Sequence, residues 1–302
     1  MLFRSAISRE TFREAVEAVW GAESPRALPV VPVVVGGDDL TAVMDGCKGI
    51  DFTRTFMEKF CKKTQEHEAV RPILEKAGLP RLGMCAGISI AKPHFPFSQS
   101  YHMAEELMQN AKEVKKQFGK DSIALDFHIL YDSVASSLSD IRERLTLSEG
   151  GTSERRLTAK PYVVSKGETG TPDEEWRRVH DFARFQSAAD ALLPAEMWLP
   201  SSQAHAVRES LFSEHRETQE AEWAFLMRTY KDFADKWRDA SNRWPDASGK
   251  PDSLYVSWRQ EGTEQGAECC STYFLDALEA VKFAASEGGG KEKVADGEEG
   301  TA

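Results

Sequence analysis

The sequence predicts an α+β protein in which a sheet-containing domain is followed by a mainly helical region. A β-branched apolar run ends at a Gly-Gly-Asp-Asp tetrapeptide, and a second apolar run follows it. Segments with helical and strand-like patterns then alternate as far as about residue 166. Beyond that point the spacing is mainly helical, and six of the seven tryptophans lie there. A chain of 302 residues with 41% apolar side chains is long enough for two such parts.

The first elements of the chain form an expected helix and hairpin. Ser8 is a helix-capping residue type, and apolar side chains recur at spacings of three and four over residues 9–20, so we expect an amphipathic helix after Ser8. Residues 28–35 are almost wholly apolar and rich in β-branched side chains, which predicts a strand covered on both faces. Residues 40–44 resume an apolar run. The simplest structure is a hairpin whose tip is residues 36–39.

The next elements alternate between helical and strand patterns. Phenylalanines at successive fourth positions predict a helix, and a loop with two prolines separates a small-residue strand from the helix that follows it. The expected helices are residues 51–77 and 98–118, with Ser98 as the cap of the second, and the expected strands are residues 82–91, 123–130 and 157–164.

Three parts of the chain are distinguished by composition. We expect a palm domain with the Gly-Gly-Asp-Asp hairpin over residues 1–166, ended by a polar break at residues 167–173. A mainly helical region should follow over residues 167–285. Residues 286–302 are nearly free of apolar side chains and are predicted to be disordered. In the helical region, one predicted core helix has its apolar seam at Trp223, Leu226, Tyr230, Phe233 and Trp237.

Overall composition excludes several classes of protein. A net charge of −11 argues against a generic nucleic-acid-coating surface, although a local basic groove is compatible with it. No Cys-x-x-Cys pair occurs among the five cysteines, which favours reduced, mostly buried thiols over zinc or redox chemistry. No run approaches the length of a membrane span, and the first ten residues lack a signal-peptide core. We therefore expect a cytoplasmic protein that does not contact a membrane.

The adjacent carboxylates of Asp38 and Asp39 are the strongest indication of chemistry. They repel each other, whereas a simple turn needs only one Asn or Asp with a Gly. A divalent cation removes this repulsion, since Mg²⁺ takes one or two carboxylates and completes its shell with water and phosphate oxygens. Gly36 and Gly37 would let a nucleotide approach the backbone closely. Two-metal phosphoryl transfer needs adjacent carboxylates beside backbone that a nucleotide can approach. For the tetrapeptide alone, the alternative interpretation is a solvated β-turn.

The order of the predicted elements is helix, strand, strand, helix, strand, helix, strand. This order matches a ferredoxin-like palm, as in nucleotide cyclases and polymerases, with its first strand removed. Beyond this order, the sequence resembles the second palm domain of the type III CRISPR large subunit over roughly residues 8–165. The segments that carry the resemblance are residues 33–41, 85–97 and 101–107, Ala111 with Lys112, residues 124–128 and residues 157–162.

The resemblance implies an ATP-dependent nucleotidyltransferase of antiviral defence that makes cyclic oligoadenylate. It implies that Asp38 and Asp39 are catalytic and hold Mg²⁺ or Mn²⁺, and that Gly36 and Gly37 face the nucleotide. Lys112 is the candidate contact to the triphosphate of ATP, with a solvated helical lysine as the alternative. Lys92 is a second, weaker candidate for the nucleotide. Other CRISPR effector subunits and RNA are the implied macromolecular partners.

One departure from the family concerns the first strand of the palm, which usually adds a metal-binding group. Residues 1–7 are too few for this strand and its loop, and the first acidic residue is Glu10. Either the gene begins late, or a partner chain supplies the missing strand, or the domain binds nucleotide without turning it over. A strand edge left open in this way would invite pairing with another chain.

Two other functional hypotheses are compatible with the sequence. A catalytically inactive or partner-dependent scaffold or sensor is one alternative, and a diguanylate-cyclase-like enzyme is another, although Leu40 stands where those cyclases usually have Phe. His180-Asp181 has the residue types of a family nuclease domain but no visible companion histidines, and the family's four-cysteine zinc site is absent. The remaining candidates, His94, His102 and His128, have no ligand spacing and are interpreted as structural.

Overall fold

The computed structural model describes most of the chain. The described residues are 2–21, 29–36, 39–131, 137–148, 153–165, 167, 174–192, 199–213, 215–242, 253–259 and 268–284. Gly37 and Asp38, most of the predicted polar break and the predicted disordered tail lie outside them. No helix in this described part combines the length and apolarity needed to cross a membrane.

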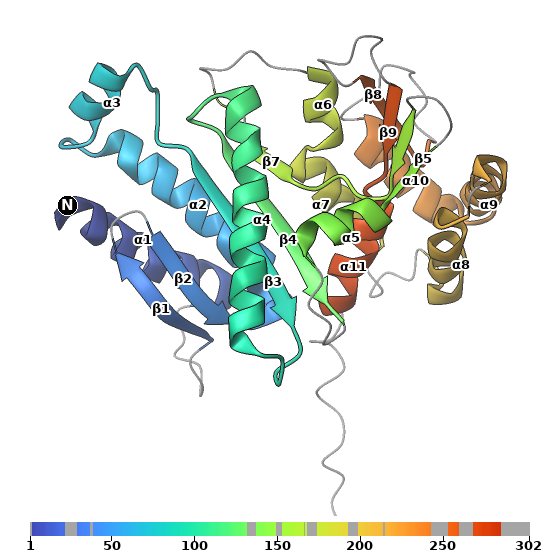
Figure 1. Ribbon diagram of the computed structural model, residues 1–302, viewed down its shortest axis with the longest axis horizontal. Coiled ribbons are helices and arrows are strands. Elements are labelled where there is room, and N and C mark those ends of the chain that lie inside the picture. The colour runs from blue at the N-terminus through green and yellow to red at the C-terminus, as the bar shows by residue number, and fades with distance from the viewer. Residues whose placement is uncertain are drawn as a thin grey trace, which may run out of the picture.

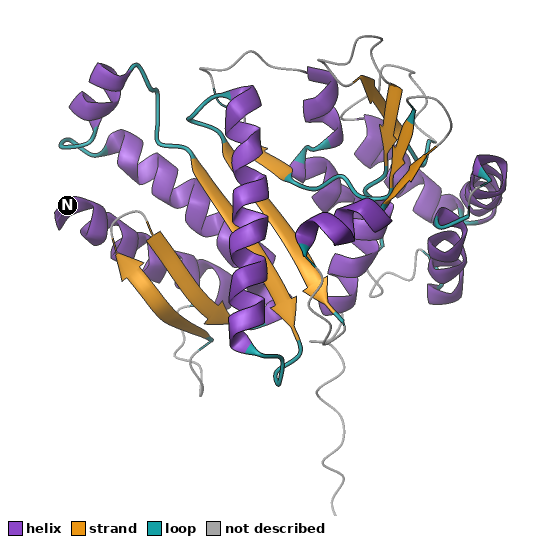
Figure 2. Ribbon diagram, viewed as in Figure 1, coloured by secondary structure: helices purple, strands orange, loops and turns teal. Residues whose placement is uncertain are grey.

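The structure is an α+β fold, which confirms the predicted class (Figures 1 and 2). The first half contains α1 (Leu2–Trp20), β1 (Val30–Gly36), β2 (Asp39–Met44), the short 3-10 helix η1 (Gly46–Lys48), α2 (Gly49–Glu66), α3 (Arg71–Ala77), β3 (Met84–Ala91), α4 (Phe97–Phe118) and β4 (Ile123–Leu130). The connecting part contains α5 (Leu138–Arg144), β5 (Thr146–Ser148), β6 (Glu154–Arg156) and β7 (Tyr162–Ser165).

The rest of the chain is mainly helical, as predicted, with two short strands. Its elements are α6 (Glu174–Val179), α7 (Phe182–Ala191), α8 (Ser201–Leu211), α9 (Arg216–Thr229), α10 (Lys231–Asn242), β8 (Val256–Arg259), β9 (Glu268–Ser271) and α11 (Phe274–Ala284).

The described strands form three sheets. β1 and β2 form an antiparallel hairpin, and β3 pairs with β4 in parallel while β7 joins β4 antiparallel. The third sheet has the order β5-β6-β9-β8. Because β6 pairs with β9, strands from both sides of the boundary predicted at residue 166 share this sheet. The two parts of the chain are therefore joined by backbone pairing.

Helices cover the palm from two sides. α1 and α2 pack on each other, α1 also contacts β1, and α2 also contacts β3 and β4. α4 packs on β3 and β4 in front of them in the view of Figure 1. Its close approach depends on Gly87, where an added Cβ would lie 2.1 Å from the Ala104 carbonyl oxygen of α4. A side chain at this position would separate the helix from the sheet.

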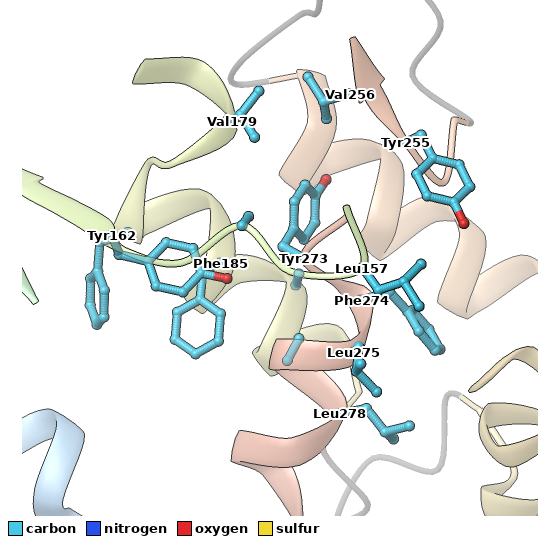
Figure 3. Packing of buried hydrophobic residues seen from close by; sticks show 14 of the residues in the cluster. Leu157, Tyr162, Val179, Phe185, Tyr255, Val256, Tyr273, Phe274, Leu275 and Leu278 are labelled. Carbon is cyan, nitrogen blue, oxygen red and sulfur yellow. The ribbon is translucent and has the colours of Figure 1, made fainter. Parts of the chain in front are cut away.

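One large hydrophobic core extends from the palm into the helical region. It includes Phe127 of β4, Phe185 of α7 and Phe274 of α11. Tyr162 and Phe185 lie against each other with ring centroids 4.6 Å apart, near the residues of α11 (Figure 3). Large aromatic side chains bury much apolar area per residue, so this shared core stabilises the association of the two parts.

Three predicted helix boundaries were wrong. Ser98 was predicted to cap the helix over residues 98–118, but it lies inside α4, whose N-cap is Pro96 without a side-chain hydrogen bond. Tertiary contacts decide the other two. α1 begins before Ser8, which is buried inside the helix and does not cap it. Ile7 and Thr11 lie on the same buried face as Ala15, so burial extends the helix toward its start. The predicted helix over residues 51–77 is broken after Glu66, where the ring of His67 accepts a hydrogen bond from the Ala69 amide (3.1 Å).

The predicted aromatic helix is also divided. Tyr230 has a non-helical backbone (φ −107°, ψ 79°) and separates α9 from α10. The break lets Trp237 of α10 turn back onto Trp223 of α9, with ring centroids 4.9 Å apart. Both rings are buried, so the seam belongs to the core as predicted, but it comes from two helices.

Two strand predictions were also corrected. Residues 157–161 precede β7 and are not part of a strand, because they turn toward α11. β1 was predicted to be covered on both faces, yet Val31, Val33 and Val34 are about half exposed. The reason is that helices α1 and α2 cover only one face of the hairpin.

Candidate nucleotide and metal site

The hairpin places one of the two predicted aspartates at the start of β2. Asp39 is exposed and lies opposite Gly36 in the register of the two strands. An added Cβ at Gly36 would meet nothing within 4 Å, so open space borders the backbone there. Gly37 and Asp38, the two residues of the tip between them, lie outside the described residues. The described part of the tip is thus accessible to a ligand.

Helix α4 runs past the hairpin and brings Tyr101 toward Asp39. The pKa of Tyr101 is raised first by its hydrogen bond to Glu105 and by the charge of Glu105, then by partial desolvation and the charge of Asp39. Asp39 and Tyr101 are therefore close enough to interact electrostatically. The sequence did not single out this tyrosine, because no motif joins the first turns of α4 to the hairpin.

Lys112 lies exposed on α4, near the start of β3. Burial raises the pKa of the Cys85 thiol, and the charges of Lys115 and Lys112 oppose this rise. Lys115 is fixed by a hydrogen bond from its ammonium group to the Gly83 carbonyl oxygen (3.0 Å). The sequence predicted Lys112 and missed Lys115, which lies one helical turn later on the same side of α4.

Arg81 adds a third positive charge to this end of the palm. Its guanidinium donates to the Asp121 carbonyl oxygen (3.1 Å) and to the Ser165 hydroxyl (2.7 Å). Burial raises the pKa of Cys61 to about 12, and the charges of Arg81 and Lys115 oppose it. These contacts place Arg81, Lys112 and Lys115 around the start of β3; we call them the basic cluster.

Asp39 and the basic cluster are related to different parts of α4, since Tyr101 lies in its first turns and Lys112 and Lys115 lie in its second half. β2 and β3 run in the same direction in Figure 1. Lys92 follows the end of β3 and is exposed in the loop at the opposite end of that strand from the basic cluster. Among the described side chains, Asp39 therefore has its neighbour at the start of α4, and neither Lys112 nor Lys92 is brought into contact with it.

The histidines occupy different environments. His94 and His102 are exposed, and His102 lies beside Glu106 with 3.6 Å between the ring and the carboxylate. His128 is mostly buried on β4, and desolvation together with the charges of Lys160 and Arg142 lowers its pKa to about 3. His128 is therefore neutral near pH 7, which agrees with its interpretation as structural.

His180 and Asp181 have structural contacts. The His180 ring stacks on Trp176 with centroids 3.7 Å apart, and its Nδ1 hydrogen-bonds with the Pro161 carbonyl oxygen (3.0 Å). Burial lowers its pKa to about 3. The Asp181 carboxylate caps α7 by accepting from the Ala183 and Arg184 amides. This pair has no feature of a metal nuclease site.

The residues present can be compared with what a divalent cation needs. Among the described residues, no group of three His, Cys, Asp or Glu side chains is arranged to hold a metal ion. Mg²⁺ in a nucleotide site takes only one or two carboxylates and receives its other ligands from water and phosphates. The exposed carboxylate of Asp39, next to Asp38 in the sequence, fits that donor set. These carboxylates do not fit a site in which protein side chains alone hold the cation.

A second polar cluster, missed from the sequence, lies between the palm and α11. The buried carboxylate of Asp276 accepts hydrogen bonds from the Thr158 hydroxyl (3.0 Å), the Ala159 amide (2.9 Å) and the Tyr162 hydroxyl (2.7 Å). The ammonium group of Lys160 lies 3.1 Å from it. Because more than 110 residues separate Asp276 from these partners, local sequence patterns carry no sign of the cluster.

The family comparison agrees with the predicted resemblance. Residues 4–124 match the family model described as Cas10/Cmr2, second palm domain. This segment runs from α1 to the first residues of β4 and includes the hairpin, Lys92 and Lys112. No curated protein matches the chain. The resemblance is confirmed for this segment.

Proposed function

We propose that this chain, which carries a Cas10/Cmr2-type second palm domain over residues 4–124, binds ATP with Mg²⁺ or Mn²⁺ at the hairpin tip and joins adenylate units into oligoadenylate. The observation that carries the proposal is the Gly-Gly-Asp-Asp hairpin inside the matched segment, with open space beside Gly36. The cyclic product and the role in antiviral defence within a type III CRISPR complex belong to the same proposal.

The proposed roles follow from charge and position. Asp39, together with Asp38, would hold the cations, and the backbone at Gly36 would lie against the nucleotide. The basic cluster would neutralise the triphosphate, with Lys112 as the exposed member able to reach it. Arg81 and Lys115 are held by protein oxygens and would contribute a fixed positive field.

The proposed reaction joins two nucleotides. A ribose hydroxyl of one ATP attacks the α-phosphorus of another and releases its proton to solvent, the new phosphodiester bond forms, and the bond to the pyrophosphate leaving group breaks. Divalent cations lower the pKa of the attacking hydroxyl and stabilise charge on the phosphate when they are bound. The side chains of Asp38 and Asp39 would hold those cations, and the basic cluster would attract the departing negative charge.

A second candidate function is nucleotide binding without turnover, as in a scaffold, sensor or partner-dependent enzyme. It is favoured by the missing first strand of the palm, because within the described residues no strand pairs with the second edge of β2 or of β3. Under this alternative the purified chain binds ATP but releases no product until another component completes the site.

Incubation of the purified chain with labelled ATP and Mn²⁺, followed by mass spectrometry of the products, tests the proposal. The matched control is the Asp38→Ala/Asp39→Ala variant. Oligoadenylate from the unmodified chain alone supports synthesis, whereas ATP binding without product supports the second candidate. Absence of ATP binding by calorimetry contradicts both. Replacing ATP with GTP distinguishes them from a diguanylate-cyclase-like enzyme, which would turn over GTP.

A further inference from the structure

The side chain of Asp39 lies on the face of the hairpin that helices α1 and α2 leave uncovered. Leu40 and Met44 of β2 pack against the hydrophobic cluster formed by these two helices. Successive side chains of a strand point to opposite faces, so Asp39 and Val43 point away from the helices. The 47% exposure of Val43 agrees with this orientation. A ligand of the Asp39 carboxylate therefore approaches from the uncovered face.

Helix α4 stands on the same side of the palm as Asp39. The Ser89 hydroxyl of β3 lies 3.0 Å from the Ser100 hydroxyl of α4. Ile88 points to the other face of β3, where an added Cβ at Gly49 of α2 would lie 3.7 Å from its Cγ2 atom. α4 and α2 thus cover opposite faces of β3. Because α2 also belongs to the layer that covers β2, α4 borders the face that carries Asp39.

Two sides of α4 are occupied by the rest of the palm. Leu107 is fully buried on the side that packs on β3 and β4. On one flank, the Asn110 amide donates to the Asp126 carboxylate of β4 (2.7 Å), and the Glu106 carboxylate accepts from the Leu138 amide of α5 (2.8 Å). This flank faces β4 and α5. The opposite flank of the helix therefore faces the hairpin.

Phe97, Tyr101 and Lys112 lie on that opposite flank. Tyr101 and Lys112 are eleven residues apart, which is close to three full turns, so they are in line at a separation of about 16 Å along the helix axis. Phe97 lies one turn before Tyr101. The pKa of Tyr101 is raised first by its hydrogen bond to Glu105 and last by the charge of Asp39, which agrees with a flank that faces the hairpin.

The two aromatic rings of this flank are exposed and lie side by side. Phe97 is 56% exposed and Tyr101 is 41% exposed. Their ring centroids are 6.1 Å apart, with an angle of 34° between the ring planes. The hydrogen bond to Glu105 holds the Tyr101 hydroxyl and so restricts its ring. Exposed aromatic faces held in this way are suited to stacking against a planar ring of a ligand.

We propose that Phe97 and Tyr101 form a stacking platform for the base of the nucleotide, between α4 and the uncovered face of the hairpin. The α-phosphate would then lie near Asp39, and the rest of the triphosphate would extend along α4 toward Lys112. This inference rests on the proposed function, because it requires a nucleotide at the hairpin tip.

The platform positions the base and does not select it. Every base has a planar face, so stacking on Phe97 and Tyr101 tolerates adenine and guanine alike. Both residues are therefore positioning residues, which place the α-phosphate beside the carboxylates without taking part in the reaction. Loss of the rings should weaken binding of the base and leave binding of the phosphates unchanged.

Two ligands and a double variant of the full chain test the platform. We expect Phe97→Ala/Tyr101→Ala to bind ATP with Mn²⁺ about tenfold more weakly by calorimetry, since stacking on an aromatic side chain contributes this much or more to binding. Binding of inorganic tripolyphosphate with Mn²⁺, which has no base, should not change. Tyr101→Phe keeps the ring and should bind ATP within about twofold of the unmodified chain.

A matched control removes a similarly exposed ring elsewhere. Phe225 of α9 is 47% exposed and lies in the helical region, so Phe225→Ala should leave the affinity for ATP unchanged. Thermal unfolding of each variant checks that the fold is retained.

Photolabelling locates the base without any substitution. ATP that carries an azide at C8 of adenine is illuminated with the unmodified chain and Mn²⁺, and the labelled peptide is identified by mass spectrometry. We expect the label on the peptide that contains Phe97 and Tyr101, and an excess of ATP should prevent it. This measurement stands even if the double variant does not fold.

The outcomes separate the platform from the proposed function. Failure of the unmodified chain to bind ATP would contradict the proposed function and the platform together. ATP binding that is equal in the unmodified chain and the double variant, or a label confined to other peptides, would overturn the platform alone. An equal loss of ATP and tripolyphosphate binding would also overturn it, because the rings would then not act on the base.

Discussion

The β1–β2 hairpin and the region around α11 are covered very differently. Val31 and Val43 of the hairpin are about half exposed, whereas Phe274 at the start of α11 is fully buried. Charges follow the same division, since Asp39 of the hairpin is exposed and Asp276 of α11 is buried with several partners. The comparison teaches that the α11 region is covered as a folded core, while the hairpin leaves apolar side chains and the Asp39 carboxylate available to other molecules.

The largest expected difference concerns one aspartate in each region. Asp276→Ala removes the acceptor of three hydrogen bonds and leaves Lys160 with a less favourable buried charge, so we expect a loss of about 3–5 kcal/mol in the free energy of unfolding. Asp45→Ala, beside the hairpin, removes a single cap to the Cys47 amide and should cost about 1 kcal/mol. Urea denaturation measures both. Equal losses would contradict the division between the regions.

The same contrast applies to two tyrosines. Tyr162→Phe deletes the hydroxyl that donates to Asp276 at 2.7 Å, and hydrogen bonds to charged groups contribute about 1.5–3 kcal/mol. Tyr101→Phe on the exposed start of α4 should change stability by less than about 0.5 kcal/mol. The midpoints of urea denaturation compare the two variants directly. A larger loss for the Tyr101 variant would place more of the stability near the hairpin than the structure indicates.

The pH dependence of the free energy of unfolding tests the buried region of the comparison. Burial lowers the pKa of His180 to about 3, whereas an unfolded histidine titrates near about 6.5. Between these values the unfolded chain binds more protons, so stability should fall as the pH falls, by about 1.4 kcal/mol per pH unit for one group.

His180→Asn retains a polar side chain near the Pro161 carbonyl and removes this titration. Denaturation at pH 7 and pH 5 should show a shallower pH dependence in the variant, with the remaining slope from His128 and the carboxylates. An unchanged slope would mean that His180 is protonated in the folded chain at pH 5.

The smallest effect is expected on the exposed face of the hairpin. Val43→Thr keeps the β-branched shape at a half-exposed position, so the free energy of unfolding should change by less than about 0.5 kcal/mol. Thermal unfolding of the isolated chain checks this value. A loss above about 1 kcal/mol would indicate that Val43 is covered in solution, which would sharpen the comparison by showing that this face has an occupant.

Much of the palm could be read from local patterns. The two apolar runs on either side of Gly-Gly-Asp-Asp predicted the hairpin. The predicted strand over residues 123–130 matches β4 residue for residue. These elements follow from periodicity and turn chemistry, which act over a few residues. Asp39 and Lys112 were identified from the sequence, and the structure shows both side chains exposed, Asp39 at the start of β2 and Lys112 on α4.

The predictions that needed distant contacts were the ones that changed. The break at Tyr230 follows from the packing of Trp237 on Trp223, and the start of α1 follows from the burial of Ile7. Lys115 and Arg81 were missed because their partners, Gly83 and Asp121, lie 32 and 40 residues away.

The sequence by itself determined the order of elements from α1 to β4 and the position of the palm hairpin, because each depends on neighbouring residues. Only the tertiary structure decided that one face of β1 stays uncovered, that β6 pairs with β9 across the predicted boundary, and that Asp276 gathers its donors from residues 158–162. The physical reason is that burial and pairing depend on which distant segments meet. No periodicity within a single segment records that outcome.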